Sequence, residues 1–207
     1  MPAAESRPER IGLLGGTFDP PHNGHAAAAR AVLATLSLDR LLLVVANDPW
    51  QKSPTRLITP AEDRFALAEA LADGIPGTEA DGREIARGGP SFTVVTVEAI
   101  RREAAEAGRP EPDLALVVGA DLVPELGTWE RVEDLKELVT LAVVSRPTTP
   151  RPPAPAGWRV QWVDGPMVNV SSSAVRRVLA QGGSIDDMCP PAVVRCIRRR
   201  GLYAVGR

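Results

Sequence analysis

Short, almost purely aliphatic runs alternate with longer stretches of good helix formers through most of this 207-residue chain. The aliphatic runs are residues 10–14, 41–45, 113–118 and 139–144. A strand with apolar residues at consecutive positions is buried on both faces, which is the usual state of a parallel strand between two helical layers. The alternation therefore predicts an α/β fold with a doubly wound, mainly parallel sheet, right-handed crossovers and ligand sites beyond the carboxyl ends of the strands.

Helix-forming composition and end signals predict four helices among these strands, over 24–36, 60–73, 93–107 and 128–138. The second has the clearest start, because Thr59 offers an N-cap, Pro60 a first helical residue and Glu62 the carboxylate of a capping box. Further along the chain, we expect a last strand at 158–163. A C-terminal helical portion, with helices at 172–181 and 191–200, completes the prediction.

The chain has the length of one globular domain, so we expect a single domain over residues 1–207. Residues 1–9 are polar and include Pro2 and Pro8, which predicts a flexible tail and excludes the apolar core of a signal peptide. Five prolines fall within residues 147–157, where no hydrophobic periodicity is present. We expect this segment to be an exposed connection within the domain.

Composition argues against several classes of function. The formal net charge of −2 gives no global basic field for a nucleic acid, and the arginines at 195–200 fit the solvated last turn of a helix. Cys189 and Cys196 are the only cysteines and lack a nearby histidine, which favours a reducing cytoplasm over a disulfide framework or a zinc site. No apolar run approaches membrane-spanning length, so no membrane partner is expected. The composition is compatible with a homo-oligomer.

Residues 15–25, with the sequence GGTFDPPHNGH, directly follow the first predicted strand and open the first predicted helix. Glycines let the backbone approach a phosphate closely, and a helix N-terminus supplies N–H groups with a partial positive charge. His22 and His25 are the only histidines of the chain, and their spacing lets both face one ligand. The pattern is neither the dinucleotide fingerprint nor the phosphate-binding P-loop. Its alternative interpretation is a turn followed by the histidines of a helix cap.

A second polar segment, VSSSAVR at residues 170–176, places serines just before a helical pattern. Serine is an ordinary N-cap residue, so simple capping is one interpretation. The other is an anion site, because hydroxyl and backbone donors at a helix N-terminus would be joined by the Arg176 guanidinium from the first turn.

At these two segments the chain resembles the nucleotidylyltransferase superfamily with an HxGH motif and a C-terminal SSxxR-type motif. Within it, the chain is similar to the bacterial nicotinate mononucleotide adenylyltransferases over residues 11–203. Further matching segments are PWQK at 49–52, RGGPSFT at 87–93, GAD at 119–121 with Trp129, and VSRP at 144–147. The chain departs from the family at Val95, where an acidic residue is usual, and in the proline-rich stretch 148–155.

The resemblance implies a Rossmann-like nucleotidylyltransferase fold and two adjoining sites. The implied ATP site comprises Gly15, Gly16, Thr17, Phe18, His22, His25, Asp121, Arg146, Ser172 and Arg176, and the implied acceptor site comprises Lys52, Thr93 and Trp129. Of these, His22, His25 and Arg176 would be catalytic, by stabilising charge on the phosphates. Mg²⁺ would arrive with ATP and be held by phosphate and water, with no metal site of the protein's own. For three of these residues there are alternative interpretations: Trp129 packs in the core, Lys52 is a solvated loop residue, and Asp121 is a turn residue.

The implied activity is transfer of AMP from ATP to nicotinate mononucleotide by direct in-line attack, giving deamido-NAD and pyrophosphate in NAD biosynthesis. ATP and nicotinate mononucleotide are the expected partners, and the cytoplasm is the expected location. One alternative is another adenylyl- or cytidylyltransferase, acting on nicotinamide mononucleotide, phosphopantetheine or glycerol phosphate. A second alternative is a non-catalytic nucleotide-binding regulator, against which His22, His25 and Arg176 argue.

Overall fold

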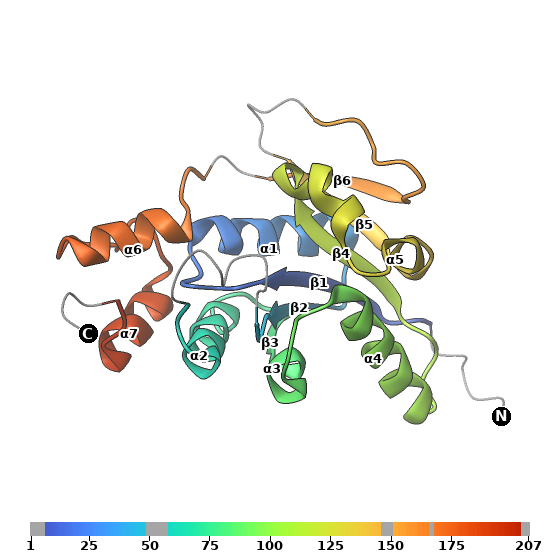
Figure 1. Cartoon of the computed structure of the whole chain (residues 1–207), viewed down its shortest axis with the longest axis horizontal. Helices are drawn as coiled ribbons and strands as arrows, with labels where there is room; N and C mark the ends of the chain where they lie inside the picture. The colour runs from blue at the N-terminus through green and yellow to red at the C-terminus, as the bar shows by residue number, and fades with distance from the viewer. Residues whose placement is uncertain (1–6, 49–57, 146–150, 166–167, 204–207) are drawn as a thin grey trace.

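A computed structural model of the chain describes residues 7–48, 58–145, 151–165 and 168–203 (Figure 1). Its centre is a six-stranded sheet in which every strand pairs in parallel with its neighbours, in the order β3-β2-β1-β4-β5-β6. The strands are β1 (Arg10–Gly16), β2 (Arg40–Val45), β3 (Thr78–Asp81), β4 (Asp113–Gly119), β5 (Thr140–Ser145) and β6 (Val160–Asp164). This order reverses direction between β1 and β4, which creates a crevice at the carboxyl ends of those two strands.

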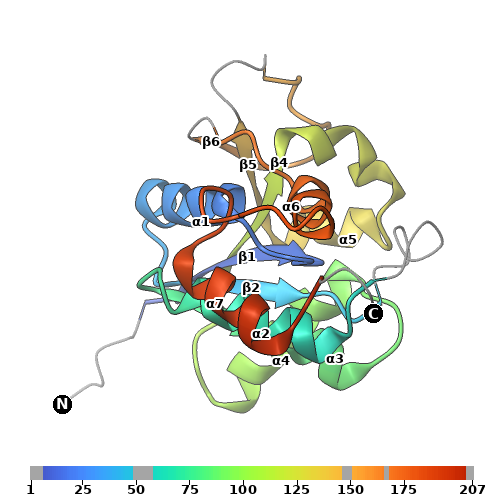
Figure 2. The ribbon, with the colours of Figure 1, turned by 90° about the vertical axis from the view of Figure 1, so that its left-hand side faces the viewer.

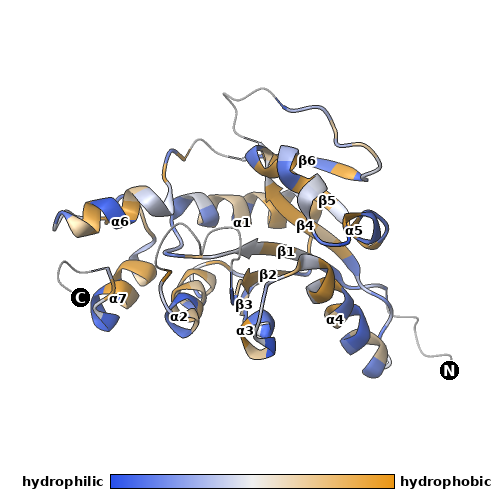
Figure 3. Cartoon of the chain, in the orientation of Figure 1, coloured by the Kyte–Doolittle hydropathy of each residue, from blue (hydrophilic) through white to orange (hydrophobic). Residues whose placement is uncertain are grey.

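Helices cover both faces of the sheet, as the aliphatic strands require. One face packs against α1 (Asn23–Leu36), α2 (Ala61–Ala72), α6 (Ser172–Ala180) and α7 (Pro191–Arg200). The other face packs against α4 (Thr93–Glu106), α5 (Val132–Leu138) and the 3-10 helix η2 (Ala120–Thr128). In Figure 3 the strands are mainly hydrophobic, whereas the outer helices carry hydrophilic residues on one side. No helix in the described ranges is long and apolar enough to span a membrane.

The C-terminal helices α6 and α7 lie at the end of the molecule toward which the β1 arrow points (Figure 1). Figure 2, viewed from that end, shows both helices in front of the sheet. Hydrogen bonds join this C-terminal portion to the start of the chain, since Asn23 N donates to the carbonyl of Met188 at 2.9 Å and Asn23 Nδ2 to that of Asp187. The last part of the sequence therefore packs beside the loop that follows β1.

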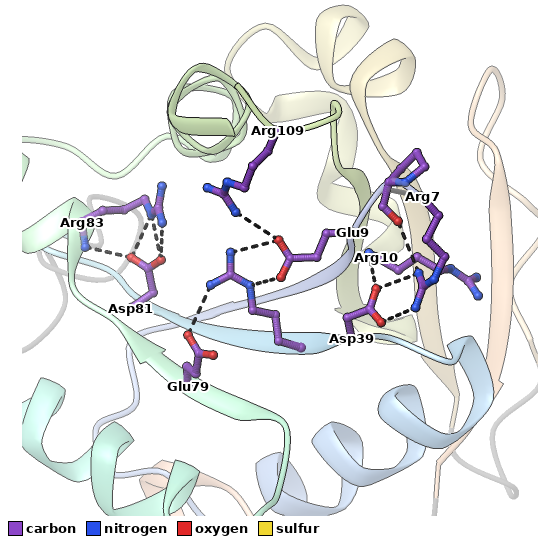
Figure 4. A network of polar contacts seen from close by, with 10 residues as sticks. Arg7, Glu9, Arg10, Asp39, Glu79, Asp81, Arg83 and Arg109 are labelled. Atoms are coloured by element: carbon purple, nitrogen blue, oxygen red, sulfur yellow. Dashed lines mark hydrogen bonds and ion pairs between the residues drawn. The ribbon is translucent and has the colours of Figure 1, made fainter. Parts of the chain in front are cut away.

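Charged side chains surround the opposite, amino-terminal edge of the sheet (Figure 4). Arg7 pairs with Asp39, which also accepts a hydrogen bond from the backbone N–H of Arg10. The bond from Arg7, and then that from Arg10, lower the pKa of Asp39 below its usual value. Arg40 pairs with both Glu9 and Glu79. A single ion pair as exposed as these contributes little to stability. Together, the pairs attach residues 7–9, which belong to the expected tail, to the sheet.

Most expected elements are present, with small shifts at their ends, but three were missed. The strand β3 and the short helix α3 (Arg83–Arg87) fall in a polar stretch without an aliphatic run. The 3-10 helix η2 contains Pro124 and occupies the start of the helix expected at 128–138, so α5 begins only at Val132. Residues 151–157 of the expected connection contain no helix or strand; residues 147–150 lie outside the described ranges.

The capping box predicted at Thr59 is wrong. The N-cap residue of α2 is Pro60, and no side chain makes a capping hydrogen bond there. Because α2 begins at Ala61, Thr59 lies one residue before the N-cap position; the Nε of the buried Arg64 side chain donates to its carbonyl at 2.8 Å. This bond ties the backbone before α2 to the guanidinium.

Candidate active site

Two cavities open at the carboxyl ends of β1 and β4, where the strand order reverses. The larger has a volume of about 380 Å³ and the smaller about 170 Å³. Gly15, Val117, Val118 and Leu122 line both cavities and form their common wall. A Cβ atom added to Gly15 would meet no other atom within 4 Å, so the backbone of this residue faces open space. A ligand in one cavity can thus approach a ligand in the other over Gly15.

The larger cavity lies against the N-terminus of α1 and is lined by His22, His25 and Asp121. The first turn of α1 contains no acidic residue. The partial positive charge at this end of a 14-residue helix favours an anion. On the far side, Asp121 belongs to the first turn of η2, and its side chain lies against Gly119, where a Cβ would clash with it.

His22 and His25 cap α1 with their own rings. Nδ1 of His22 accepts a hydrogen bond from Gly24 N at 3.1 Å, and Nδ1 of His25 accepts one from His22 N at 3.2 Å. The ring centroids are 4.0 Å apart. A ring nitrogen that accepts an N–H bond carries no proton, so in each uncharged ring the proton is on Nε2. The capping interpretation is thus confirmed, and the same bonds make each Nε2 a hydrogen-bond donor.

Phe18 supports His25 from the protein interior. Its ring is buried, and the centroids of the Phe18 and His25 rings are 5.2 Å apart. Phe18 has a φ of 51°, a left-handed backbone conformation that is uncommon for a residue with a bulky side chain. The expected contact of Phe18 with ATP stays a prediction.

Ser172 and Arg176 lie at the start of α6, where they hold the loop after β1. Ser172 Oγ donates to the Pro20 carbonyl at 2.8 Å, and Arg176 Nη1 donates to the Asp19 carbonyl. The N-cap of α6 is the preceding residue, Ser171, whose hydroxyl accepts from Ala174 N. Neither Ser172 nor Arg176 is among the described residues that line the two cavities. Their expected contacts with phosphate stay predictions.

The smaller cavity lies between β1 and α4. Gly16, Thr17, Thr93 and Trp129 line it, so the structure brings the expected acceptor residues Thr93 and Trp129 together. The N-terminus of α4 has no side-chain cap and no acidic residue in its first turn, where Val95 stands. Trp129 is half-buried and also packs against the core. Its interpretation as a core residue is therefore compatible with its interpretation as an acceptor-site residue.

Sequence reasoning missed three polar residues of the smaller cavity: Ser91, Glu84 and Thr96. Thr96 Oγ1 donates to the buried Glu84 Oε1 at 2.6 Å, and Ser91 Oγ accepts from Asn47 N at 2.9 Å. Ser91 lies within the segment RGGPSFT at 87–93 that carries the resemblance, and Thr96 is a single polar residue on an otherwise apolar face of the predicted helix. Lys52 and Arg146 lie outside the described residues. Among the described residues, no group of three His, Cys, Asp or Glu side chains is placed to hold a metal ion.

The comparisons with known proteins agree on one family. The cytidylyltransferase-like family pattern matches residues 13–178. A probable nicotinate-nucleotide adenylyltransferase of Methylibium petroleiphilum is 41% identical over 206 residues, covering 96% of this chain and 94% of the relative. A protein of the same name from Acidothermus cellulolyticus is 36% identical over 200 residues, covering 95% of each chain.

Solved structures share the fold. Plasmodium falciparum nicotinic acid mononucleotide adenylyltransferase complexed with NaAD superposes with a TM-score of 0.77 at 15% identity, covering 94% of this chain and 97% of that one. A putative nicotinate-nucleotide adenylyltransferase from Vibrio parahaemolyticus gives a TM-score of 0.65 at 19% identity, with coverage of 92% and 99%. Together with the parallel sheet, these likenesses confirm the doubly wound, Rossmann-like fold expected from the sequence.

Proposed function

The chain belongs to the nicotinate-nucleotide adenylyltransferase family, and from this premise we propose that it transfers AMP from ATP to nicotinate mononucleotide. The products are deamido-NAD and pyrophosphate. The chain is a nucleotidyltransferase enzyme of NAD biosynthesis. We place the reaction in the cytoplasm, with ATP and nicotinate mononucleotide as its partners.

The observation that carries the proposal is the pair of cavities joined over Gly15. An adenylyl transfer needs the acceptor phosphate in line with the α-phosphorus and the leaving pyrophosphate. An acceptor oxygen forms a bond to that phosphorus while the bond to the bridging oxygen breaks, and the electron pair leaves with pyrophosphate. Holding two substrates in this geometry can supply most of the catalysis without a nucleophilic side chain. Two adjoining cavities with a common glycine wall suit that requirement.

In the larger cavity, the ATP phosphates would lie at the N-terminus of α1. The Nε2–H groups of His22 and His25 would donate to oxygens that gain charge as the new bond forms. Their directions are fixed beforehand by the two Nδ1 bonds, so little reorganisation is needed during the reaction. Asp121 would hold a ribose hydroxyl. Mg²⁺ would accompany the triphosphate and neutralise part of its charge, held mainly by phosphate and water.

In the smaller cavity, the nicotinate carboxylate would lie near the uncapped N-terminus of α4, beside Thr93. Backbone N–H groups and a hydroxyl can donate to a carboxylate, and the partial charge of the helix end favours an anion. The absence of an acid in the first turn of α4 makes this end more favourable still for a negative ligand. Trp129 would stack on the pyridine ring.

The test is incubation with ATP and Mg²⁺ against nicotinate mononucleotide, nicotinamide mononucleotide, phosphopantetheine and glycerol phosphate, following pyrophosphate release and the mass of the product. We expect kcat/KM for nicotinate mononucleotide to exceed that for the nicotinamide form by at least about tenfold, or about 1.4 kcal/mol. Equal use of the two pyridine acceptors would contradict the assignment of the smaller cavity while leaving adenylyl transfer in place. Reaction with another acceptor alone would overturn the proposed substrate.

A further inference from the structure

A buried carboxylate lies in the wall of the smaller cavity. Glu84, on the short helix α3, is 5% exposed and lines this cavity beside Ser91, Thr93 and Thr96. Its Oε1 accepts a hydrogen bond from the Thr96 hydroxyl at 2.6 Å. That length is typical of an O–H group that donates to an ionised carboxylate. Glu84 is the only charged side chain among the described residues that line the smaller cavity.

The charge of Glu84 has no cationic side chain to balance it in the described part of the chain. The nearby Asp81 is also buried, but its carboxylate pairs with Arg83 at 2.7 Å. For Glu84, the bond from Thr96 is the contact that the described residues supply, and that donor is neutral. A buried carboxylate is costly unless a positive group compensates its charge. A cationic ligand in the smaller cavity would supply that compensation.

We propose that Glu84 is a specificity-determining residue, which selects acceptors whose ring carries a positive charge. Nicotinate mononucleotide is such an acceptor, because its ring nitrogen is bonded to ribose and is therefore a pyridinium. With its carboxylate, the ring of this compound is a zwitterion. The inference rests on the proposed function and adds a second recognition element to the same site, directed at the ring nitrogen.

The two charges of the ring match two points one turn apart on α4. Thr93 is the first residue of the helix, where backbone N–H groups and a hydroxyl favour the ring carboxylate. Thr96 lies three positions further on the same face, about 5–6 Å away, and holds the Glu84 carboxylate. A ring placed along this face would have its carboxylate at the helix end and its cationic nitrogen toward Glu84. The reversed ring would bring two carboxylates together, so Glu84 also determines the orientation of the ring.

The main test compares Glu84→Gln with the wild type. Glutamine keeps the shape of the side chain and an oxygen for the Thr96 hydroxyl, and it removes only the charge. Calorimetry in the presence of Mg²⁺ and α,β-methylene-ATP, which cannot transfer AMP, measures Kd for two acceptors. One is nicotinate mononucleotide, and the other is its C-nucleotide analogue, whose ring is joined to ribose through carbon and is uncharged at neutral pH. We expect Glu84→Gln to raise Kd for nicotinate mononucleotide at least about fivefold, or about 1 kcal/mol, and Kd for the analogue less than about twofold.

Glu98→Gln is the matched control, because it makes the same change of charge on α4. Glu98 pairs with Arg131 near the surface and lies outside the described linings of both cavities. This variant should leave both Kd values within about twofold of the wild type. An equal effect of Glu98→Gln and Glu84→Gln would overturn the proposal, since it would reflect only the net charge of the protein.

Two further outcomes would contradict the role of Glu84. An unchanged Kd for nicotinate mononucleotide in Glu84→Gln would show that the carboxylate does not act on the ring. An equal rise in Kd for the charged and the uncharged ring would show that Glu84 only supports the cavity through Thr96. The proposed function fails separately: it is overturned if the wild type does not adenylylate nicotinate mononucleotide. If the wild type does so while Glu84→Gln affects both rings equally, only the inference about Glu84 is overturned.

Discussion

His22 and His25 each use one ring nitrogen for the backbone of α1 and present the other as a donor. The hydrogen bonds that the rings accept from Gly24 N and His22 N have two effects. They satisfy backbone N–H groups at the start of the helix, and they determine which nitrogen of each ring carries the proton. Substitution of either histidine therefore has two separable costs. One falls on the stability of the helix and the other on the chemistry.

The change His22→Ala removes both functions, whereas His22→Ser keeps an oxygen that can cap the helix. We expect both variants to lose at least about 10² in kcat, because neither can donate to a phosphate oxygen from that position. Only the alanine variant should also lose about 1 kcal/mol in the free energy of unfolding, as is usual when an N-cap is lost. Urea unfolding and single-turnover kinetics measure the two effects. Turnover by the serine variant within about threefold of the wild type would remove His22 from the catalytic residues.

At the scale of elements, one side chain joins α2 to the ends of two strands. Arg64 is 1% exposed, and its guanidinium donates to the carbonyls of Thr17, Ala46, Asn47 and Thr59. Thr17 follows β1, Ala46 and Asn47 follow β2, and Thr59 precedes α2. Thr17 and Ala46 also line the smaller cavity. The planar fork therefore fixes the spacing of the backbone segments that form one wall of that cavity.

Replacing Arg64 with methionine fills much of the same space but leaves these buried carbonyls without their donor. We expect the free energy of unfolding to fall by at least about 3 kcal/mol, because each unsatisfied buried acceptor costs about 1–3 kcal/mol. Arg64→Lys should recover less than half of this loss, since an ammonium cannot span four carbonyls. Glu69→Ala, on the exposed side of α2, is the control and should change stability by less than about 0.5 kcal/mol. A methionine variant as stable as the wild type would show that the carbonyls find other partners.

Elements were predictable from the sequence where local composition decides them. The central strands are buried on both faces, so their aliphatic runs stand out, whereas β3 is an edge strand of four mainly polar or small residues. The histidine pair was found because short spacing within one helix turn brings side chains together. Contacts between distant residues leave no such periodic signal: the Tyr203–Asp19 bond and the Glu84–Thr96 pair depend on how the chain folds back.

At the scale of the whole molecule, strand order determines where the two substrates can meet. The sheet reverses between β1 and β4, and Gly15 lies at the end of β1 beside this reversal. Residues of β1 and β4 line both cavities; the smaller cavity also borders α4, and the larger borders the start of α1. Gly15 is one of the four residues that line both cavities. A Cβ atom here would enter the open space beside the two cavities without meeting another protein atom within 4 Å.

We therefore expect Gly15→Ala to fold normally and to lose activity. The φ of Gly15 lies outside the left-handed region, so alanine is tolerated, and removing a strand glycine can even stabilise by about 0.5–1 kcal/mol. The added methyl should lower kcat/KM for ATP and for the acceptor by at least about tenfold, because small displacements at the reacting atoms have large effects on rate. Gly127→Ala is a matched control: its Cβ also meets nothing within 4 Å, and Gly127 is outside the described linings of both cavities. If Gly15→Ala and Gly127→Ala were equally active, the substrates would have to meet elsewhere than over β1.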